Sequence, residues 1–298
     1  MADSTNSLVS KPAGRSPAAG RALDHLLAAL PALWLLVVFV APLGFTLVFS
    51  FGHSSFGGIK LGFTLDNYAQ ALSGFYLESF LRTIQFAVSG CILCLLVAYP
   101  AALFIARQPP TRRTPLLLLV LVPYFTSFLI RVMSWQIILA RGGPAEFALN
   151  LLHLLNGPLD VLDTQTAVFI GLVYAYLPIA VVPIYLVLAR IPQPLIEASR
   201  DLGGSALQTF WHVILPLSRP GLATAALLTG VPMLGELVIP VLLGGDKGVL
   251  MGMAISQQYL ATQNYALGSA MAVLVLIAVA VMVALLVRLT RGFEEISA

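Results

Sequence analysis

The sequence predicts an all-α, polytopic membrane protein with about six transmembrane helices, and two observations carry that prediction. Of its 298 residues, 59% are hydrophobic and only 10% are charged, whereas about a quarter of the residues of a soluble domain are charged. The apolar residues also gather into runs of the ~20 helical residues that cross a hydrocarbon core ~30 Å thick. Because so few charges cannot cover a water-facing surface, we expect the chain in a lipid bilayer.

The spans are predicted in order along the chain. Residues 1–22 are rich in Ser, Ala, Pro and Gly and are expected to form a disordered cytoplasmic tail. The first span runs from about Leu26 to Phe51, which is too long for a signal-peptide core, so we expect it to remain as a membrane helix. The transmembrane domain is predicted to cover 23–292, with a cytoplasmic tail at 293–298. The further spans are predicted at 79–106, 114–140, 167–189, 217–243 and 266–288.

Prolines interrupt several of these spans. Each proline frees a backbone carbonyl, which is tolerated at membrane depth only beside protein or a water-filled cavity. Their concentration in spans three to five favours those helices as cavity walls, although simple kinking is the plain alternative. The boundaries of the fifth span are the least well defined for the same reason. The prolines are Pro100, Pro123, Pro178, Pro183, Pro220, Pro232 and Pro240.

The distribution of Lys and Arg predicts the orientation. Eleven of the sixteen lie on one side of the predicted spans: Lys11, Arg15, Arg21, Arg107, Arg112, Arg113, Arg190, Arg200, Arg219, Arg288 and Arg291. Four lie on the other side, at Lys60, Arg82, Arg141 and Lys247, and Arg131 lies within a span. By the positive-inside rule, both termini are expected in the cytoplasm; the inner membrane of a bacterial cell is implied by the family resemblance given below.

Several function classes are excluded by composition. A net charge of +3 with no dense Lys/Arg run is too weak for a nucleic-acid footprint. Cys91 and Cys94 lie inside an apolar run, where buried thiols are expected rather than a redox pair. No G-x-x-x-x-G-K-[ST] loop occurs, so the chain is not expected to hydrolyse nucleotide itself. With two Cys and four scattered His, no metal site is expected, and no cofactor is expected on this chain.

The segment 190–216, between the fourth and fifth predicted spans, carries charged residues among apolar ones at helical spacing. Pro192 and Pro194 predict the start of a short helix, and Gly203 predicts its end. A second helix is expected to run to Pro216 and lead into the fifth span. A small amphipathic element on the cytoplasmic side suits docking into a groove of a partner, and an ordinary amphipathic linker is the alternative.

This segment resembles the EAA loop of ABC importer permeases, which reads E-A-A, three residues, G, nine residues, I-x-L-P. Glu197, Ala198, Gly203, Leu215 and Pro216 match that form. Ser199 replaces the second Ala and Val213 replaces Ile, and both changes conserve size. The resemblance implies contact with the ATP-hydrolysing subunit through Glu197, Ala198, Ser199, Asp201, Gly203, Leu215 and Pro216.

Three further stretches resemble the spermidine/putrescine-type permeases. They are Pro-Tyr-Phe-Thr-Ser-Phe-Leu-Ile-Arg at 123–131, Gly-Glu-Leu-Val-Ile-Pro at 235–240 and Thr-Leu-Asp-Asn-Tyr at 64–68. The resemblance extends over about 30–290 and implies a type I ABC importer permease that forms half of a translocation path. It further implies a polyamine or related amine as solute, a cytoplasmic ATPase dimer that binds ATP and Mg, a second homologous permease and an extracytoplasmic solute-binding protein.

Arg131 and Glu236 are the ionisable residues predicted well inside spans. A charge there costs at least a few kcal/mol, so such residues usually face a cavity or each other. Similar predicted depths allow either a structural ion pair or a role in transport. Among the aromatic residues of these spans, Tyr124 and Tyr174 are candidates for the path of an organic cation. Trp135 is expected in packing or at the interface, and Tyr176 and Tyr185 are assigned no role.

Two rival functions remain at this point. A secondary transporter driven by an ion gradient would also place polar residues at membrane depth, but it predicts inverted repeats, which the sequence lacks. A membrane-embedded enzyme needs paired Asp, Ser/His or an H-E-x-x-H site at depth, and none of these patterns occurs.

Overall fold

The computed structural model describes residues 29, 31–55, 58–154 and 157–291, so the tails predicted at 1–22 and 293–298 lie outside it. The chain divides into two units, Met1–Val48 and Phe49–Ala298. The described part of the first unit is helical, and this helix ends at Ser50. It contains a π-helical turn, η1 (Leu36–Val40), followed by α2 (Ala41–Ser50). From Pro31 to Ser50 it is long and apolar enough to cross a membrane, as predicted for the first span.

The second unit is helical except for one short antiparallel hairpin in which His53 pairs with Lys60. In its first half lie β1 (His53–Ser55), β2 (Gly58–Lys60), α3 (Asp66–Ala71), α4 (Gly74–Ala106), α5 (Pro110–Leu121), η2 (Val122–Phe125), α6 (Phe128–Leu139) and α7 (Pro144–Leu151). In its second half lie α8 (Gln165–Leu188), α9 (Gln193–Asp201), α10 (Ala206–Thr209), η3 (Phe210–Ile214), α11 (Leu215–Leu234), α12 (Val238–Leu243), α13 (Met251–Leu260) and α14 (Tyr265–Arg291). The predicted all-α class is confirmed.

The described residues include 5 helices that could each cross a membrane, or 6 if one bent pair counts as a single span. That pair is the predicted third span, 114–140, and the prediction of one continuous helix there is wrong. Its two halves, Pro110–Phe125 and Phe128–Leu139, meet at 85°.

The bend has a local cause. Pro123 has no backbone N–H, and the chain tightens into the 3₁₀ turn η2 around it. Thr126 is extended, with φ −72° and ψ 162°, and its hydroxyl donates to the Pro123 carbonyl at 2.7 Å. The Thr126 N–H donates to the same carbonyl at 3.3 Å and closes the 3₁₀ turn, after which the chain starts α6 in a new direction.

The predicted fifth span, 217–243, is also broken. A continuous helical path through α10, η3 and α11 runs from Ala206 to Leu234, so it starts earlier and ends earlier than predicted. Pro232 lies in the last turn of α11, and Gly235 follows its end. The chain then resumes as the short helix α12, and Glu236 lies in the break.

The core lies where α4, α8 and α11 pack together. Small buried side chains line it, among them Ala87, Ala98, Ala175 and Ala225. Small residues let helix backbones approach closely inside a membrane, where water supplies no hydrophobic driving force between helices. Gly171 shows how close the approach is, because a Cβ atom there would lie 2.6 Å from Leu243 of α12.

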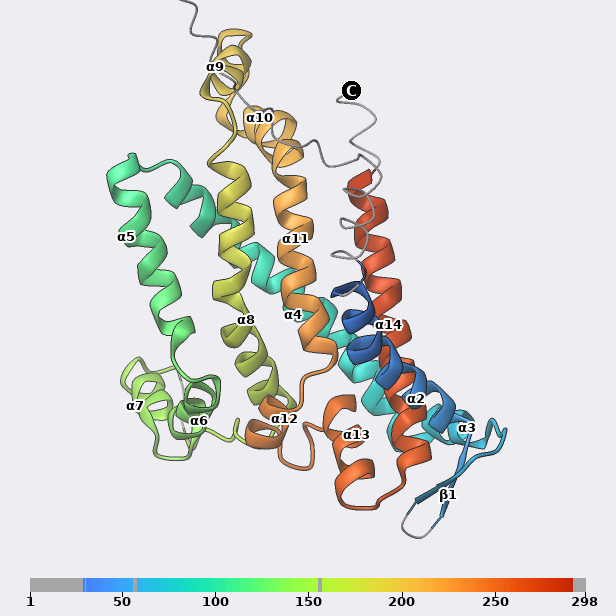
Figure 1. The fold of residues 1–298 in the computed structure, drawn as a ribbon. Coiled ribbons are helices and arrows are strands. Elements are labelled where there is room, and N and C mark those ends of the chain that lie inside the picture. The colour runs from blue at the N-terminus through green and yellow to red at the C-terminus, as the bar shows by residue number, and fades with distance from the viewer. Residues whose placement is uncertain (1–28, 30, 56–57, 155–156, 292–298) are drawn as a thin grey trace, which may run out of the picture. The chain divides into compact units, whose positions relative to one another are not determined.

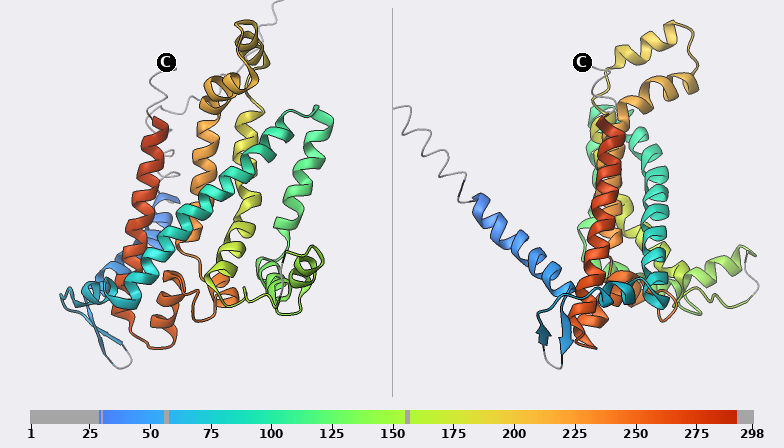
Figure 2. Two further views of the ribbon diagram at one scale, coloured as in Figure 1. Left: turned by 180° about the vertical axis from the view of Figure 1, so that it is seen from behind. Right: turned by 90° about the vertical axis from the view of Figure 1, so that its right-hand side faces the viewer.

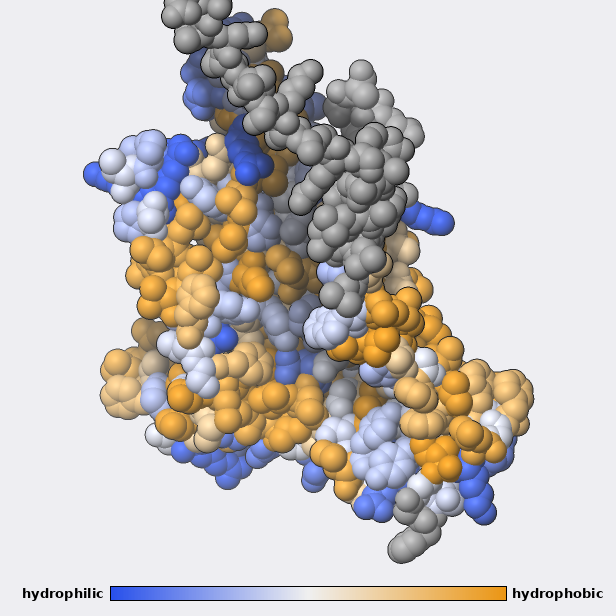
Figure 3. Space-filling view, viewed as in Figure 1, coloured by the Kyte–Doolittle hydropathy of each residue, from blue (hydrophilic) through white to orange (hydrophobic). Residues whose placement is uncertain are grey.

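Two ends of the second unit are distinct. Figures 1 and 2 show α9 and α10 at one end of the long helices, with α7, α12, α13 and the hairpin at the other. On the face shown in Figure 3, hydrophobic residues cover α5, and hydrophilic ones gather where that helix begins. Arg112 and Arg113 belong to its first turn. The segment 190–216 therefore lies at the opposite end of the bundle from α7, α12, α13 and the hairpin.

Candidate functional site

The segment 190–216 folds as two short helices joined by a sharp turn, which we call the elbow (α9, α10 and η3). Pro194 lies in the first turn of α9, where its missing N–H costs nothing. Gly203 ends the helix with φ +83°, a left-handed conformation that strains other residues. The Gly204 N–H donates to the Ser199 carbonyl at 3.0 Å and closes the turn.

The second helix of the elbow is capped and tied to the first. Ser205 accepts a hydrogen bond from the Gln208 N–H at 3.3 Å, and the Gln208 side chain accepts one from the Ser205 N–H at 2.8 Å. Together they form a capping box. The hydroxyls of Ser199 and Thr209 lie 3.0 Å apart and join the two helices. Hydrogen bonds therefore hold the turn of the elbow and also join its two helices.

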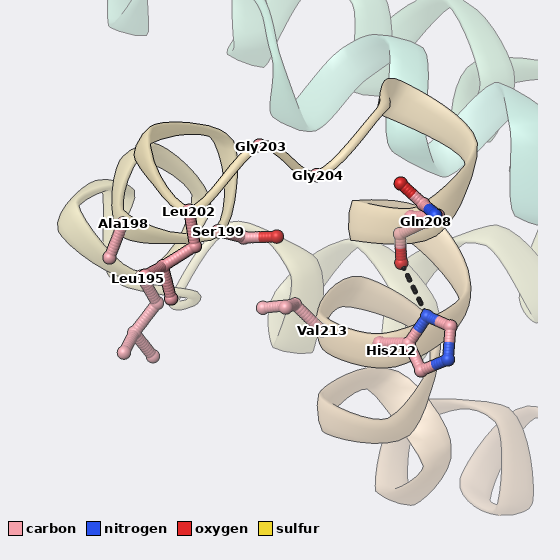
Figure 4. Close-up of a pocket in the computed structure, with 9 residues that line it drawn as sticks. All are labelled: Leu195, Ala198, Ser199, Leu202, Gly203, Gly204, Gln208, His212 and Val213. Atoms are coloured by element: carbon pink, nitrogen blue, oxygen red, sulfur yellow. Dashed lines mark hydrogen bonds between the residues drawn. The ribbon is translucent and has the colours of Figure 1, made fainter.

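An open groove of about 550 Å³ lies between the two helices of the elbow (Figure 4). Leu195 and Ala198 line it from α9, and Val213 lines it from η3. Leu202, at its edge, is 90% exposed. Leu195 is also exposed, so apolar side chains on α9 border the groove. The full lining is Leu195, Ala198, Ser199, Leu202, Gly203, Gly204, Gln208, His212 and Val213.

The predicted coupling residues divide into three groups. Ala198, Ser199 and Gly203 line the groove, whereas Glu197 and Asp201 are exposed on α9 outside it. Leu215 and Pro216 begin α11. Leu215 packs against the core, whereas Pro216 is half-buried beside it, so Leu215 joins the elbow to the bundle.

A polar cluster, which we call the carboxylate cluster, consists of Tyr176, Glu236 and the start of α12. It lies away from the elbow, toward the opposite end of the long helices. Glu236 is only 7% exposed. Its Oε2 accepts a hydrogen bond from the Tyr176 hydroxyl at 2.5 Å. Its Oε1 accepts from the N–H groups of Val238 at 2.8 Å and Ile239 at 3.3 Å, so the carboxylate also caps α12.

Arg131 does not pair with Glu236. Within the described residues, the ion pair found is Arg141–Asp160. The Arg131 guanidinium carbon lies 5.0 Å from the ring centre of Tyr124 and 5.8 Å from that of Phe128, in cation–π range. Arg131 is 8% exposed, and its Nε has no hydrogen-bond partner among the described residues. The structural ion pair considered from the sequence is therefore not formed.

The structure separates Tyr174 from the carboxylate cluster and adds Tyr176 in its place. The Tyr174 ring packs edge-on against Trp135, with ring centres 5.3 Å apart. Residues two apart on a helix point to different sides, so Tyr176 rather than Tyr174 reaches Glu236. Gln136 of α6 donates to the Leu242 carbonyl of α12 at 2.5 Å and holds these two helices together.

The outer loop between α6 and α8 is fixed by charged groups. Arg141 and Asp160 form an ion pair at 2.5 Å, and this hydrogen bond raises the pKa of Arg141. The Glu146 carboxylate accepts the Leu159 N–H at 3.0 Å and the Gly142 N–H at 2.9 Å. These two backbone donors stabilise the charged form and lower the pKa of Glu146.

Comparison with known proteins assigns the family. The family of binding-protein-dependent transport system inner membrane components matches residues 98–295, about two thirds of the chain. The chain belongs to this family. It is a subunit of an inner-membrane transport system rather than an enzyme. Transport by systems of this family depends on a binding protein.

The permease resembles characterised relatives over most of its length. It is 37% identical over 233 residues to the spermidine/putrescine transport system permease protein PotB of Escherichia coli, covering 78% of this chain and 85% of the relative. The corresponding protein of Haemophilus influenzae is 35% identical over 210 residues, covering 70% of this chain and 73% of the relative.

The fold also matches a solved structure. The bacterial alginate ABC transporter, crystallised with a pentasaccharide-bound periplasmic protein, gives a TM-score of 0.66 at 17% identity, covering 92% of this chain and 96% of that one. At this identity the likeness establishes the fold alone. The permease has the type I ABC importer fold, as predicted, and the alternative of an ion-driven secondary transporter is not retained.

Proposed function

We propose that this permease forms half of the translocation path of an ATP-driven importer for a small organic amine, with a polyamine such as putrescine or spermidine as the solute. The observation that carries the choice of solute is the 37% identity to permeases of spermidine and putrescine systems. The buried carboxylate of Glu236 is compatible with it, because an ammonium group can replace the Tyr176 hydroxyl as its partner.

The carboxylate cluster is proposed as the point where the amine enters the membrane path. A cation held by a buried carboxylate alone would dissociate slowly. A transport path must bind its solute weakly enough to release it. The guanidinium of Arg131 lies on α6, which Gln136 ties to α12, and this positive charge is proposed to favour release of the amine further along the path. Tyr124 covers that guanidinium and keeps it from the lipid. Tyr174 has no place in this proposal.

The elbow is proposed as the coupling element. With both termini in the cytoplasm, as the Lys/Arg distribution favours, α9 and α10 enter the cytoplasm and the groove between them receives a surface of the ATPase. The residues proposed for contact are Ala198, Ser199 and Gly203 in the groove and Glu197 and Asp201 beside it. Leu215 and Pro216 would transmit the movement into α11.

The complete importer is proposed to contain a second homologous permease, a cytoplasmic ATPase dimer and an extracytoplasmic solute-binding protein. ATP and Mg are proposed to bind to the ATPase subunits, where ATP hydrolysis supplies the free energy for transport. The second permease completes the path on the side that this chain leaves open. The binding protein delivers the amine to the outer loops, near α7 and α12.

Uptake of labelled solute tests the proposal. The permease is expressed with its partner subunits in cells that lack polyamine import, and labelled putrescine, spermidine, a neutral sugar and a dicarboxylate are compared. We expect uptake of a polyamine that requires the ATPase subunits. Uptake of the sugar or the dicarboxylate alone would contradict the proposed solute. Uptake that persists without the ATPase and stops with a protonophore would contradict the proposed energy source.

A further inference from the structure

A second cavity, of about 470 Å³, lies where the elbow meets the bundle, and it differs in character from the groove. Residues at the end of α4, the start of α5, the end of α8, α9 and η3 line it. The complete lining is Leu103, Ala106, Arg107, Arg113, Leu188, Ala189, Ile191, Gln193, Ile196, Arg200 and Ile214. The volume is within the roughly 300–1,000 Å³ of small-molecule pockets.

The charge of this cavity is one-sided. Arg107, Arg113 and Arg200 contribute to its lining, and none of the described residues that line it is Asp or Glu. Within the described residues, none of the three arginines forms an ion pair. The Arg113 Nε donates to the Gln108 carbonyl at 2.7 Å, which orients the guanidinium and leaves its two terminal nitrogens available. Three guanidinium groups around one cavity attract an anion, and the planar fork of each suits phosphate.

The rest of the lining is apolar. Leu103 and Leu188 belong to the long helices α4 and α8, and Ile196 and Ile214 come from the elbow. Figure 1 shows the turn between α4 and α5 at the same end of the helices as α9, the end that carries most of the Lys and Arg. The cavity therefore combines apolar walls continuous with the spans and cationic groups at their ends, as the head-group region of a bilayer does.

We propose that this cavity binds the phosphate of an anionic phospholipid from the cytoplasmic leaflet. The arginines hold the phosphate, and the apolar walls accommodate the glycerol and the first carbons of the acyl chains. Basic pockets between transmembrane helices on the cytoplasmic side are a recognised form of lipid site. Because Arg200 belongs to α9, while Arg107 and Arg113 flank the α4–α5 turn, one bound phosphate ties the elbow to the bundle. This inference is independent of which solute the permease carries.

Native mass spectrometry of the full-length chain tests the proposal. The protein is transferred from detergent to mixed micelles with phosphatidylglycerol or phosphatidylcholine, and retained lipid is counted against lipid concentration. The cavity variant is R107Q/R113Q/R200Q. The matched control is R112Q/R190Q/R288Q, which removes the same charge from exposed sites on the same side that do not line the cavity. A variant with lysine at all three cavity positions retains the charge.

We expect phosphatidylglycerol to be retained in preference to phosphatidylcholine. Loss of each cavity arginine should weaken retention about fivefold, as ~1 kcal/mol per basic residue implies. The control and the lysine variant should retain the lipid. If the cavity variant does not fold, Arg107→Gln alone should show the single-step loss.

Two results would overturn the inference. In the first, the cavity variant and the control retain phosphatidylglycerol equally. In the second, inorganic phosphate displaces the lipid at similar concentration, which would mean that the acyl chains contribute nothing and that the ligand is free phosphate.

Discussion

The hydroxyl of Tyr176 lies 2.5 Å from the carboxylate of Glu236 and donates a hydrogen bond to it, although the two residues are 60 positions apart. This bond joins α8 to the break between α11 and α12. Because the same carboxylate accepts two backbone N–H groups of α12, both of its oxygens are occupied. An amine that replaced the Tyr176 hydroxyl would therefore break the link between α8 and the carboxylate that caps α12, and would affect the positions of both helices.

Glu236→Gln should weaken amine uptake. The substitution keeps an oxygen that can cap α12 but removes the charge that attracts an ammonium group. A charge-assisted hydrogen bond contributes about 1.5–3 kcal/mol, so the apparent KM should rise tenfold or more. Initial rates of labelled putrescine uptake measure it. Glu78→Gln, at an exposed site on α4, is the control and should leave KM unchanged. An unchanged KM in Glu236→Gln would remove this residue from the path.

Tyr176→Phe should change uptake in a way that depends on Glu236. Only a hydroxyl is lost, and a hydrogen bond to a charged carboxylate contributes about 1.5–3 kcal/mol, so KM should change about tenfold or more. The decisive comparison is with the double variant. If the two residues act as one unit, the double variant should be no worse than Glu236→Gln alone. Additive effects would mean that the two side chains act separately.

Gly203→Val should uncouple ATP hydrolysis from transport. A β-branched residue at φ +83° costs about 1–3 kcal/mol, which is enough to distort the turn of the elbow. We expect normal membrane insertion with solute-stimulated ATPase activity reduced about fivefold or more in proteoliposomes. Gly58→Val adds the same side chain where the backbone has open space and should keep wild-type activity. Full stimulation in Gly203→Val would show that the elbow geometry is not needed.

Acid should loosen the outer loop that Glu146 holds. The pKa of this carboxylate is lowered in the folded protein, because its charged form stabilises the loop. That stabilisation is fully present above the unfolded pKa and is lost as pH falls through the folded pKa, below about 4.5. Hydrogen exchange at the Leu159 and Gly142 amides, corrected for intrinsic rates, should lose protection in that range. In Glu146→Gln, exchange should not vary with pH there. A wild-type loop that keeps its protection at acid pH would contradict this assignment.

The elements that sequence reasoning predicted are those that local chemistry determines. Apolar runs predict spans without knowledge of their neighbours, and Pro194 and Gly203 determine the ends of a helix within a few residues of themselves. The bend at Pro123 was not predicted, because a proline in a membrane helix can produce a slight kink or a full turn, and the surrounding packing decides between them. The partner of Glu236 depends on how α8 is rotated, so Tyr174 and Tyr176 were indistinguishable from sequence alone.

The central claim is that the elbow lies in the cytoplasm and receives the ATPase, and labelling of Leu202→Cys with a membrane-impermeant maleimide tests it most directly. Leu202 is 90% exposed, and the native Cys91 and Cys94 are buried, so a single site reacts. We predict labelling in inside-out vesicles but not in intact cells, with protection when the ATPase subunits are present. Labelling from outside the cell, or labelling that the ATPase does not change, would contradict the account.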